Sequence, residues 1–151
     1  MLHVYEFEVF EDEGLFLAFP FDMDGGTQGR DMAEVAEMAA DWLQTEMEHR
    51  AMHGLPFPAP TFWNALAHGG ERLVVAVNAG KDTVARMTAA AAARELGVTP
   101  GRVSQMVKAG LLESFEDDGR TWISRGSVEA RKAEAPKAGR PKKEAAAPSA
   151  V

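Results

Sequence analysis

Cysteine is absent from this 151-residue chain. Its absence excludes a disulfide scaffold, a zinc finger and a thiol nucleophile, and it is typical of proteins kept in a reducing compartment. Long hydrophobic runs are absent too: the longest strongly apolar stretch, Leu73–Val77, is far shorter than the roughly 20 residues that span a bilayer. Residues 1–14 have neither a basic segment nor an apolar segment, so we expect no signal peptide. These absences predict a soluble cytoplasmic protein.

Basic residues are scarce in the first half of the chain. Residues 1–80 contain 14 Asp and Glu against 3 Lys and Arg, a net charge of −11. Residues 81–133 and residues 134–151 each carry a net charge of +2, and the whole chain carries −7. This division predicts a basic partner for the first half and is compatible with nucleic acid as a partner for the second.

The sequence pattern of the first half predicts several strands, then one helix and a last strand. Residues 3–10 alternate in polarity, and Leu15–Phe19 is apolar on both faces, so the two form a hairpin with a central second strand. A short strand near Thr27 precedes an amphipathic helix expected over residues 31–49. Residues 71–77 are the last strand. The order β-β-β-α-β keeps the strands and the helix apart, which predicts an α+β domain.

The second half changes to short helices from Met87 onward. Thr88 and Thr99 are each placed to cap a helix, and Pro100 occupies the first position of the second helix. Gly97 provides the turn between the two helices. This spacing fits a helix-turn-helix with no gap.

A hairpin and a final helix are expected after this pair. Asp118-Gly119 indicates a two-residue turn between two short strands, and Ser127 begins the helix. We therefore assign domains to residues 1–80 and 87–133, with residues 81–86 as a linker. From Glu134 the chain is rich in Ala, Pro and Lys without an apolar face, so residues 134–151 are expected to be a disordered basic tail.

The second helix of the pair has an outward face that suits DNA. Its apolar residues, Val103 and Met106, are expected to point inward. Arg and Gln side chains can recognise guanine and adenine edges, and Thr, Ser and Lys suit phosphates. The predicted DNA-binding residues are Thr99, Gly101, Arg102, Ser104, Gln105 and Lys108. The alternative is an ordinary helical hairpin with solvated polar residues.

The run Met87–Ala130 places a helix-turn-helix, a hairpin and a short helix in an order that resembles the excisionase and MerR-type winged-helix family. The resemblance implies that the second helix enters the major groove and that the hairpin wing lies along the DNA backbone, through Arg120 and Thr121. The wing also carries four carboxylates, which repel phosphate: Glu113, Glu116, Asp117 and Asp118. We therefore expect the helix to contribute more to DNA binding than the wing.

The last segment adds a second DNA-binding pattern. Residues 138–143, Ala-Gly-Arg-Pro-Lys-Lys, resemble the core of an AT-hook, in which Arg lies in the minor groove. The resemblance adds Arg140, Lys142 and Lys143 to the predicted DNA-binding residues. The alternative is a basic tail that only aids solubility.

Several features of the first half occur together in a recognisable order. These are the pair Phe19-Pro20, the triplet Thr27-Gln28-Gly29, the helix directly after it, the segment Gly54–Pro60 and the strand Leu73–Val77. The combination resembles the HicB antitoxin family. The resemblance implies a small, partial ribonuclease-H-like fold that binds and masks a HicA-like toxin, a small basic ribonuclease that cuts messenger RNA. It also implies that the DNA-binding domain behind it represses the operon.

An acidic domain suits a basic, RNA-binding partner by electrostatic complementarity. The candidate toxin-binding residues are Glu6, Glu8, Asp22, Asp24, Glu37 and Asp41. A solvated surface is the alternative for each of them.

Catalysis, cofactors and metal ions are not expected. Two-metal nuclease chemistry needs several converging carboxylates, and the spacing of Glu6, Glu8 and Asp24 does not require convergence. His49 and His53 lack a His-Glu-x-x-His pattern and lie where the helix ends.

The sequence thus predicts an antitoxin that neutralises its toxin and represses its own operon, as a homodimer or higher homo-oligomer. The alternative is a stand-alone transcriptional regulator whose HicB-like domain senses a ligand or mediates oligomerisation.

Overall fold

The computed structural model describes residues 1–134. They form two compact units, Met1–Thr83 and a second that begins at Val84. The architecture is α+β, and both of its sheets are antiparallel. No helix within residues 1–134 combines the length and the apolar character needed to cross a membrane.

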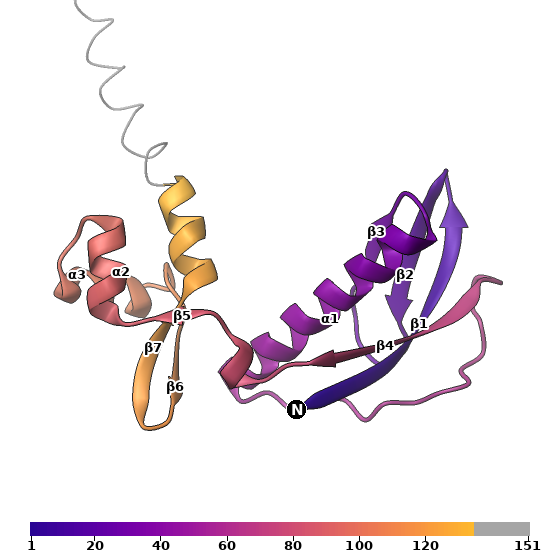
Figure 1. The fold of residues 1–151 in the computed structure, drawn as a ribbon, viewed down its shortest axis with the longest axis horizontal. Helices are drawn as coiled ribbons and strands as arrows, with labels where there is room; N and C mark the ends of the chain where they lie inside the picture. Colours follow the sequence, from indigo (N-terminus) through magenta and orange to yellow (C-terminus); the bar gives the residue numbers. More distant parts are fainter. Residues whose placement is uncertain (135–151) are drawn as a thin grey trace, which may run out of the picture. The chain divides into compact units, whose positions relative to one another are not determined.

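The first unit is built on a four-stranded sheet with the order β3-β2-β1-β4 (Figure 1). Its strands are β1 (Leu2–Asp12), β2 (Leu15–Pro20), β3 (Thr27–Gly29) and β4 (Glu71–Asn78). Glu13 and Gly14, with φ of 50° and 81°, form the two-residue turn of the β1–β2 hairpin. β1 lies between β2 and β4 and pairs with both along most of its length.

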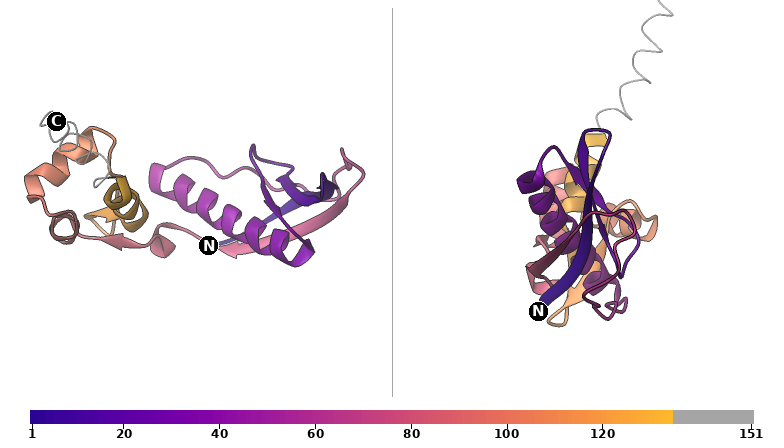
Figure 2. Two further views of the ribbon diagram at one scale, coloured as in Figure 1. Left: turned by 90° about the horizontal axis from the view of Figure 1, so that it is seen from above. Right: turned by 90° about the vertical axis from the view of Figure 1, so that its right-hand side faces the viewer.

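A single long helix, α1 (Met32–His53), lies along one face of this sheet (Figure 2). It begins where the Asp31 carboxylate accepts the Glu34 N–H and ends at Gly54, which has a φ of 64°. The helix is four residues longer than predicted because no breaker precedes Gly54. Its buried stripe comprises Val35, Ala39, Leu43 and Met47, packed against alternate residues of the strands, including Tyr5, Phe7, Val9 and Val75.

Gly29 fixes the distance between β3 and α1. A Cβ atom at this position would lie 2.5 Å from the Val35 backbone nitrogen. Only glycine permits this approach, which explains why the chain passes directly from the Thr27-Gln28-Gly29 strand into the helix.

Over residues 84–134, the second unit joins a three-stranded sheet to three helices. The sheet has the order β5-β7-β6, from β5 (Arg86–Met87), β6 (Ser114–Asp117) and β7 (Arg120–Ser124). The helices are α2 (Ala89–Leu96), α3 (Pro100–Lys108) and residues 125–134. Their shared core comprises Met87, Ala92, Ala93, Val103, Met106, Leu112, Ile123 and Val128.

Two boundaries differ from those expected. Residues 81–86, assigned as a linker, contain a 3₁₀ turn, η1 (Lys81–Thr83), and the first residue of β5. The final helix begins at residue 125, before Ser127, because the Ser124 hydroxyl accepts the Ser127 N–H at 3.2 Å and acts as the cap.

Candidate functional site

The helix caps and the glycine turn that the sequence predicts are present in the α2–α3 pair. Thr88 caps α2 by accepting the Ala91 N–H, and Thr99 caps α3 by accepting the Arg102 N–H, both at 3.1 Å. Between them Gly97 has a φ of 68°, a conformation that glycine adopts without strain. The first turn of α3 is therefore fixed by a cap and by Pro100 before any ligand binds.

The solvent side of α3 carries all six residues predicted from its sequence. Each is exposed: Thr99, Gly101, Arg102, Ser104, Gln105 and Lys108. Val103 and Met106 are buried on the opposite side. The Arg102 Nη1 donates to Gln105 Oε1 at 3.3 Å, and the Ser104 hydroxyl donates to the Pro100 carbonyl at 3.4 Å. The result is a polar face with two cations, free of large apolar side chains.

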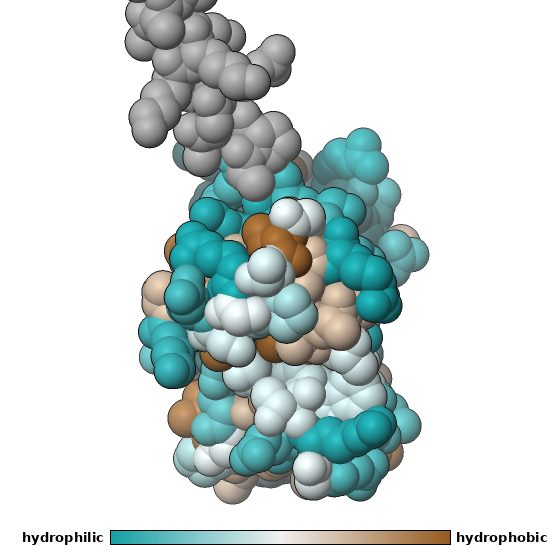
Figure 3. All heavy atoms as spheres, turned by 90° about the vertical axis from the view of Figure 1, so that its left-hand side faces the viewer, coloured by the Kyte–Doolittle hydropathy of each residue, from teal (hydrophilic) through white to brown (hydrophobic). Residues whose placement is uncertain are grey.

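The face of the second unit turned toward the viewer in Figure 3 is mainly hydrophilic or neutral. Hydrophobic residues appear there only as small separate areas. A surface of this kind suits a polar, charged ligand better than an apolar one.

The β6–β7 hairpin turns at Asp118 and Gly119, with φ of 52° and 72°, as the Asp-Gly pair predicts. Arg120 and Thr121 follow the turn and are exposed. The guanidinium of Arg120 lies 5.8 Å from the centroid of the Trp122 ring, which holds it beside the sheet. Both predicted wing contacts are therefore available at the tip of the hairpin.

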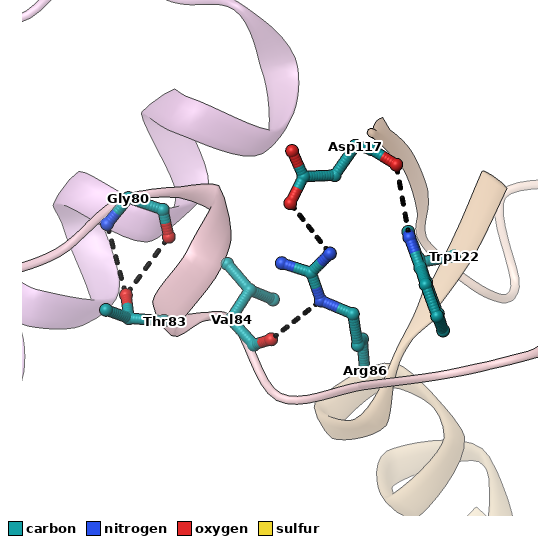
Figure 4. Close-up of polar contacts among 6 residues, drawn as sticks. All are labelled: Gly80, Thr83, Val84, Arg86, Asp117 and Trp122. Carbon is teal, nitrogen blue, oxygen red and sulfur yellow. Dashed lines mark hydrogen bonds and ion pairs between the residues drawn. The ribbon is translucent and has the colours of Figure 1, made fainter. Parts of the chain in front are cut away.

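The wing carboxylate of Asp117 is paired with a cation within the unit. Arg86 pairs with Asp117 at 2.8 Å, and the Trp122 indole N–H donates to the Asp117 carbonyl at 3.3 Å (Figure 4). The Arg86 guanidinium also lies over the rings of Phe115 and Trp122, with centroid distances of 4.8 and 5.3 Å. The hairpin is thus less negative than its sequence implies, and the predicted phosphate repulsion is correspondingly smaller.

Glu6 and Glu8 are buried, which corrects the expectation that they belong to an exposed acidic surface. Each is only 2% exposed. They lie on the face of β1 opposite α1, where residues 61–70 cover them. Glu6 accepts the N–H groups of Trp63 and Asn64 and the Asn64 side-chain amide, at 2.9–3.0 Å.

Glu8 likewise accepts hydrogen bonds from backbone N–H groups further along the loop. Its carboxylate accepts the backbone N–H groups of Ala67, His68 and Gly70 at 2.8–3.1 Å. These bonds satisfy loop amides that have no strand partner, so the two carboxylates are structural anchors for the segment.

Burial of Glu6 and Glu8 by itself raises the pKa of each carboxyl, but the N–H donors outweigh it. The net effect lowers the pKa of both groups below the ordinary value of 4.5. Arg72 adds to the lowering at Glu6, and His68 adds to it at Glu8. Both groups are therefore ionised at neutral pH.

The other four acidic candidates lie on the loop after β2 and on α1. Asp22 accepts the Thr61 N–H at 2.9 Å and the Thr61 hydroxyl at 2.6 Å, and it ties the loop after β2 to the long loop before β4. Asp24, in the same loop, is exposed. Glu37 and Asp41 are exposed one turn apart on α1. Arg140, Lys142 and Lys143 lie outside the described residues.

Comparison with known proteins gives a structural likeness and no match of sequence. No family model matches the chain, and no curated protein matches it. Among solved structures, it is similar to a chain of a toxin–antitoxin complex from Streptococcus pneumoniae, with a TM-score of 0.48 and 16% identity. The match covers 73% of this chain and 99% of that chain. At this identity and TM-score, the likeness does not establish a shared family.

Two structural features are not predicted by the sequence. Arg86 lies in the segment assigned as a linker, so nothing local connects it with Asp117, 31 residues away. Trp63, in the loop pinned by Glu6, is 85% exposed, although tryptophan in an apolar stretch normally predicts burial. The one available signal is the clustering of Phe62, Trp63 and prolines outside any periodic segment.

Proposed function

We propose that this protein is a HicB-like antitoxin. Its first unit binds and neutralises a small basic toxin that cleaves messenger RNA, and its second unit is a winged helix-turn-helix that binds the operator of its own operon. The protein acts as a homodimer or higher homo-oligomer, because paired recognition helices raise the affinity for a repeated half-site.

The exposed face of α3 is the observation that carries this proposal. A helix suits the major groove when its polar residues face outward and its apolar residues hold it to the core. Arg102 and Gln105 are the side chains suited to guanine and adenine edges. Thr99 and Lys108 are exposed near either end of the helix, and their side chains are of types that contact phosphates.

The charge of the first unit supports a basic protein partner. Residues 1–80 carry a net charge of −11, and Asp24, Glu37 and Asp41 are exposed. A surface of this sign repels nucleic acid and accelerates association with a cationic protein. The two activities therefore fall on separate units of the chain.

In this proposed role the protein binds its partners and has no catalytic activity. A nuclease of the two-metal type needs carboxylates with free oxygens close together. Glu6 and Glu8 are buried, and the carboxylate oxygens of each accept hydrogen bonds from three N–H donors. Asp22 is likewise engaged by Thr61.

Two measurements on the full chain test the proposal. The chain should shift DNA taken from upstream of its own gene. It should also co-purify with the small basic protein encoded beside that gene and suppress its toxicity on co-expression. DNA binding without any effect on toxicity would favour the stand-alone regulator. If the chain neither binds this DNA nor suppresses the toxicity of the small basic protein, the proposal is rejected.

A further inference from the structure

Trp63 is the most exposed large hydrophobic side chain in residues 1–134, at 85%. The next are Met1 and Leu2 at the chain start, at 67% and 66%. Tryptophan is usually largely covered in a folded protein, because its ring has a large apolar area. An indole left in water is therefore a feature that folding of the unit does not explain.

The backbone at Trp63 is also unfavourable for this residue. Its φ is 60°, in the left-handed region that bulky side chains rarely occupy. Glycine or asparagine adopts this conformation more readily. Tryptophan at position 63 therefore gains stability neither from packing nor from its backbone conformation. Backbone strain of this kind is typically retained where a side chain is used for binding.

Glu6 holds the strained conformation in place. Its two carboxylate oxygens accept the N–H groups of Trp63 at 3.0 Å and Asn64 at 2.9 Å. On the other side, Arg72 Nε donates to the Asn64 carbonyl at 2.8 Å. The indole is thus presented on a loop fixed before binding, which lowers the entropy lost on association.

The surroundings of Trp63 combine apolar and acidic groups. Phe62 is 44% exposed, and Val74, the cross-strand neighbour of Glu6 on β4, is 55% exposed. Thr61, two residues before Trp63, is hydrogen-bonded to Asp22 in the loop after β2, and Asp24 is exposed in that loop. We call Phe62, Trp63, Val74, Asp22 and Asp24 together the Trp63 surface.

We infer that the Trp63 surface is the docking site for the basic protein partner, with the indole inserted into an apolar pocket bordered by Lys or Arg. This inference rests on the proposed function and names the residue that anchors it. A central aromatic residue with a charged border is the usual composition of an interface hot spot. A second copy of the chain would bring the same acidic border, on a first half whose residues 1–80 carry a net charge of −11, so charge favours a cationic partner over self-association.

The decisive variant is Trp63→Asn in the full chain. Asparagine tolerates the left-handed backbone, so the loop should keep its hydrogen bonds to Glu6 and the melting temperature should not fall. The matched control is Leu111→Asn, which removes an apolar side chain that is 41% exposed on the second unit. Calorimetry should measure binding of each variant to the small basic protein encoded beside the gene.

We expect Trp63→Asn to weaken binding at least tenfold and Leu111→Asn to leave it unchanged. Equal affinity of wild type and Trp63→Asn overturns the inference but leaves the proposed function intact. No binding by the wild-type chain rejects both. If sedimentation instead shows that the isolated chain self-associates and that Trp63→Asn abolishes this, the surface is a homotypic interface and the inference is wrong.

Discussion

Arg102 and Gln105 are hydrogen-bonded to each other on the exposed face of α3, through Nη1 and Oε1 at 3.3 Å. The bond joins the two side chains whose chemistry suits base edges, and it lies one turn beyond the Thr99 cap. Each side chain therefore limits the rotamers of the other before DNA is present. Removal of either side chain should therefore also change the position of the other.

For this reason Arg102→Ala and Gln105→Ala should each weaken operator binding by about 1–3 kcal/mol and reduce discrimination between operator and unrelated DNA. The double variant should lose less than the sum of the two, because the side chains act as a pair. Fluorescence anisotropy with DNA from upstream of the gene provides the measurement. Unchanged affinity in both single variants would contradict the assignment of α3 as the recognition helix.

Lys108→Ala serves as a contrast on the same helix. Lys108 lies in the last turn and is exposed. As a phosphate contact it should contribute equally on every sequence, so its removal should weaken specific and non-specific binding alike. The slope of log affinity against log salt should fall by about 1.

The sequence predicts helix α3 well because its signals are local. Thr99, Pro100 and the Val103–Met106 spacing all act within one or two turns, and the structure follows them. The acidic residues of β1 are different. Alternation places Glu6 and Glu8 opposite the α1 face, but their hydrogen-bond donors come from a loop more than 50 residues later.

No periodic pattern signals that backbone amides of an irregular segment will cover a strand face. Polar residues on that face therefore look solvated in the sequence, although they are buried in the fold. The same limit applies to Arg86, whose partner Asp117 is brought beside it only by the pairing of β5 with β7 and of β7 with β6. In both units, polar contacts between residues far apart in the sequence are not predicted by local sequence patterns.

The Arg86–Asp117 pair should stabilise the hairpin of the second unit. The side chains are only 19% and 24% exposed, so Arg86→Met leaves a largely buried carboxylate without this cation. We expect a loss of about 1–3 kcal/mol in the free energy of unfolding, measured by hydrogen exchange of the β6 and β7 amides. Adding Asp117→Asn should restore part of this lost free energy, and failure of the rescue would show that the ion pair with Asp117 is not the main source of the loss.

Acid should release the loop that carries Trp63. Folding lowers the pKa of Glu6 and Glu8 below 4.5, so their contribution to stability is complete above that pH and is lost as pH falls through the lowered values. Glu8→Gln should reduce the melting temperature at pH 7, and the gap to wild type should narrow below about pH 4.5. Glu37→Gln, on the exposed face of α1, is the control and should melt like wild type at pH 7. A gap that stays constant across this range would show that the charge of Glu8 is not what holds the loop.

Gly101 offers a way to separate stability from DNA binding. It is the second residue of α3, and Gly126 is the second residue of the helix over 125–134, so the two glycines occupy equivalent positions. A Cβ at Gly126 meets nothing within 4 Å, and one at Gly101 meets only the Thr99 hydroxyl oxygen at 3.9 Å. Gly101→Ala and Gly126→Ala should therefore each stabilise the second unit, by about 0.4–1 kcal/mol, because alanine restricts the unfolded chain.

Their effects on DNA binding should differ. If the start of α3 approaches the DNA closely, the methyl group of Gly101→Ala occupies space at the interface and weakens operator binding. Gly126→Ala leaves α3 unchanged, so its affinity should equal that of wild type. Anisotropy and chemical denaturation of the same two variants give both quantities. Equal DNA affinity in the two variants would place the backbone of Gly101 away from the DNA and move the contact toward the side chains of Arg102 and Gln105.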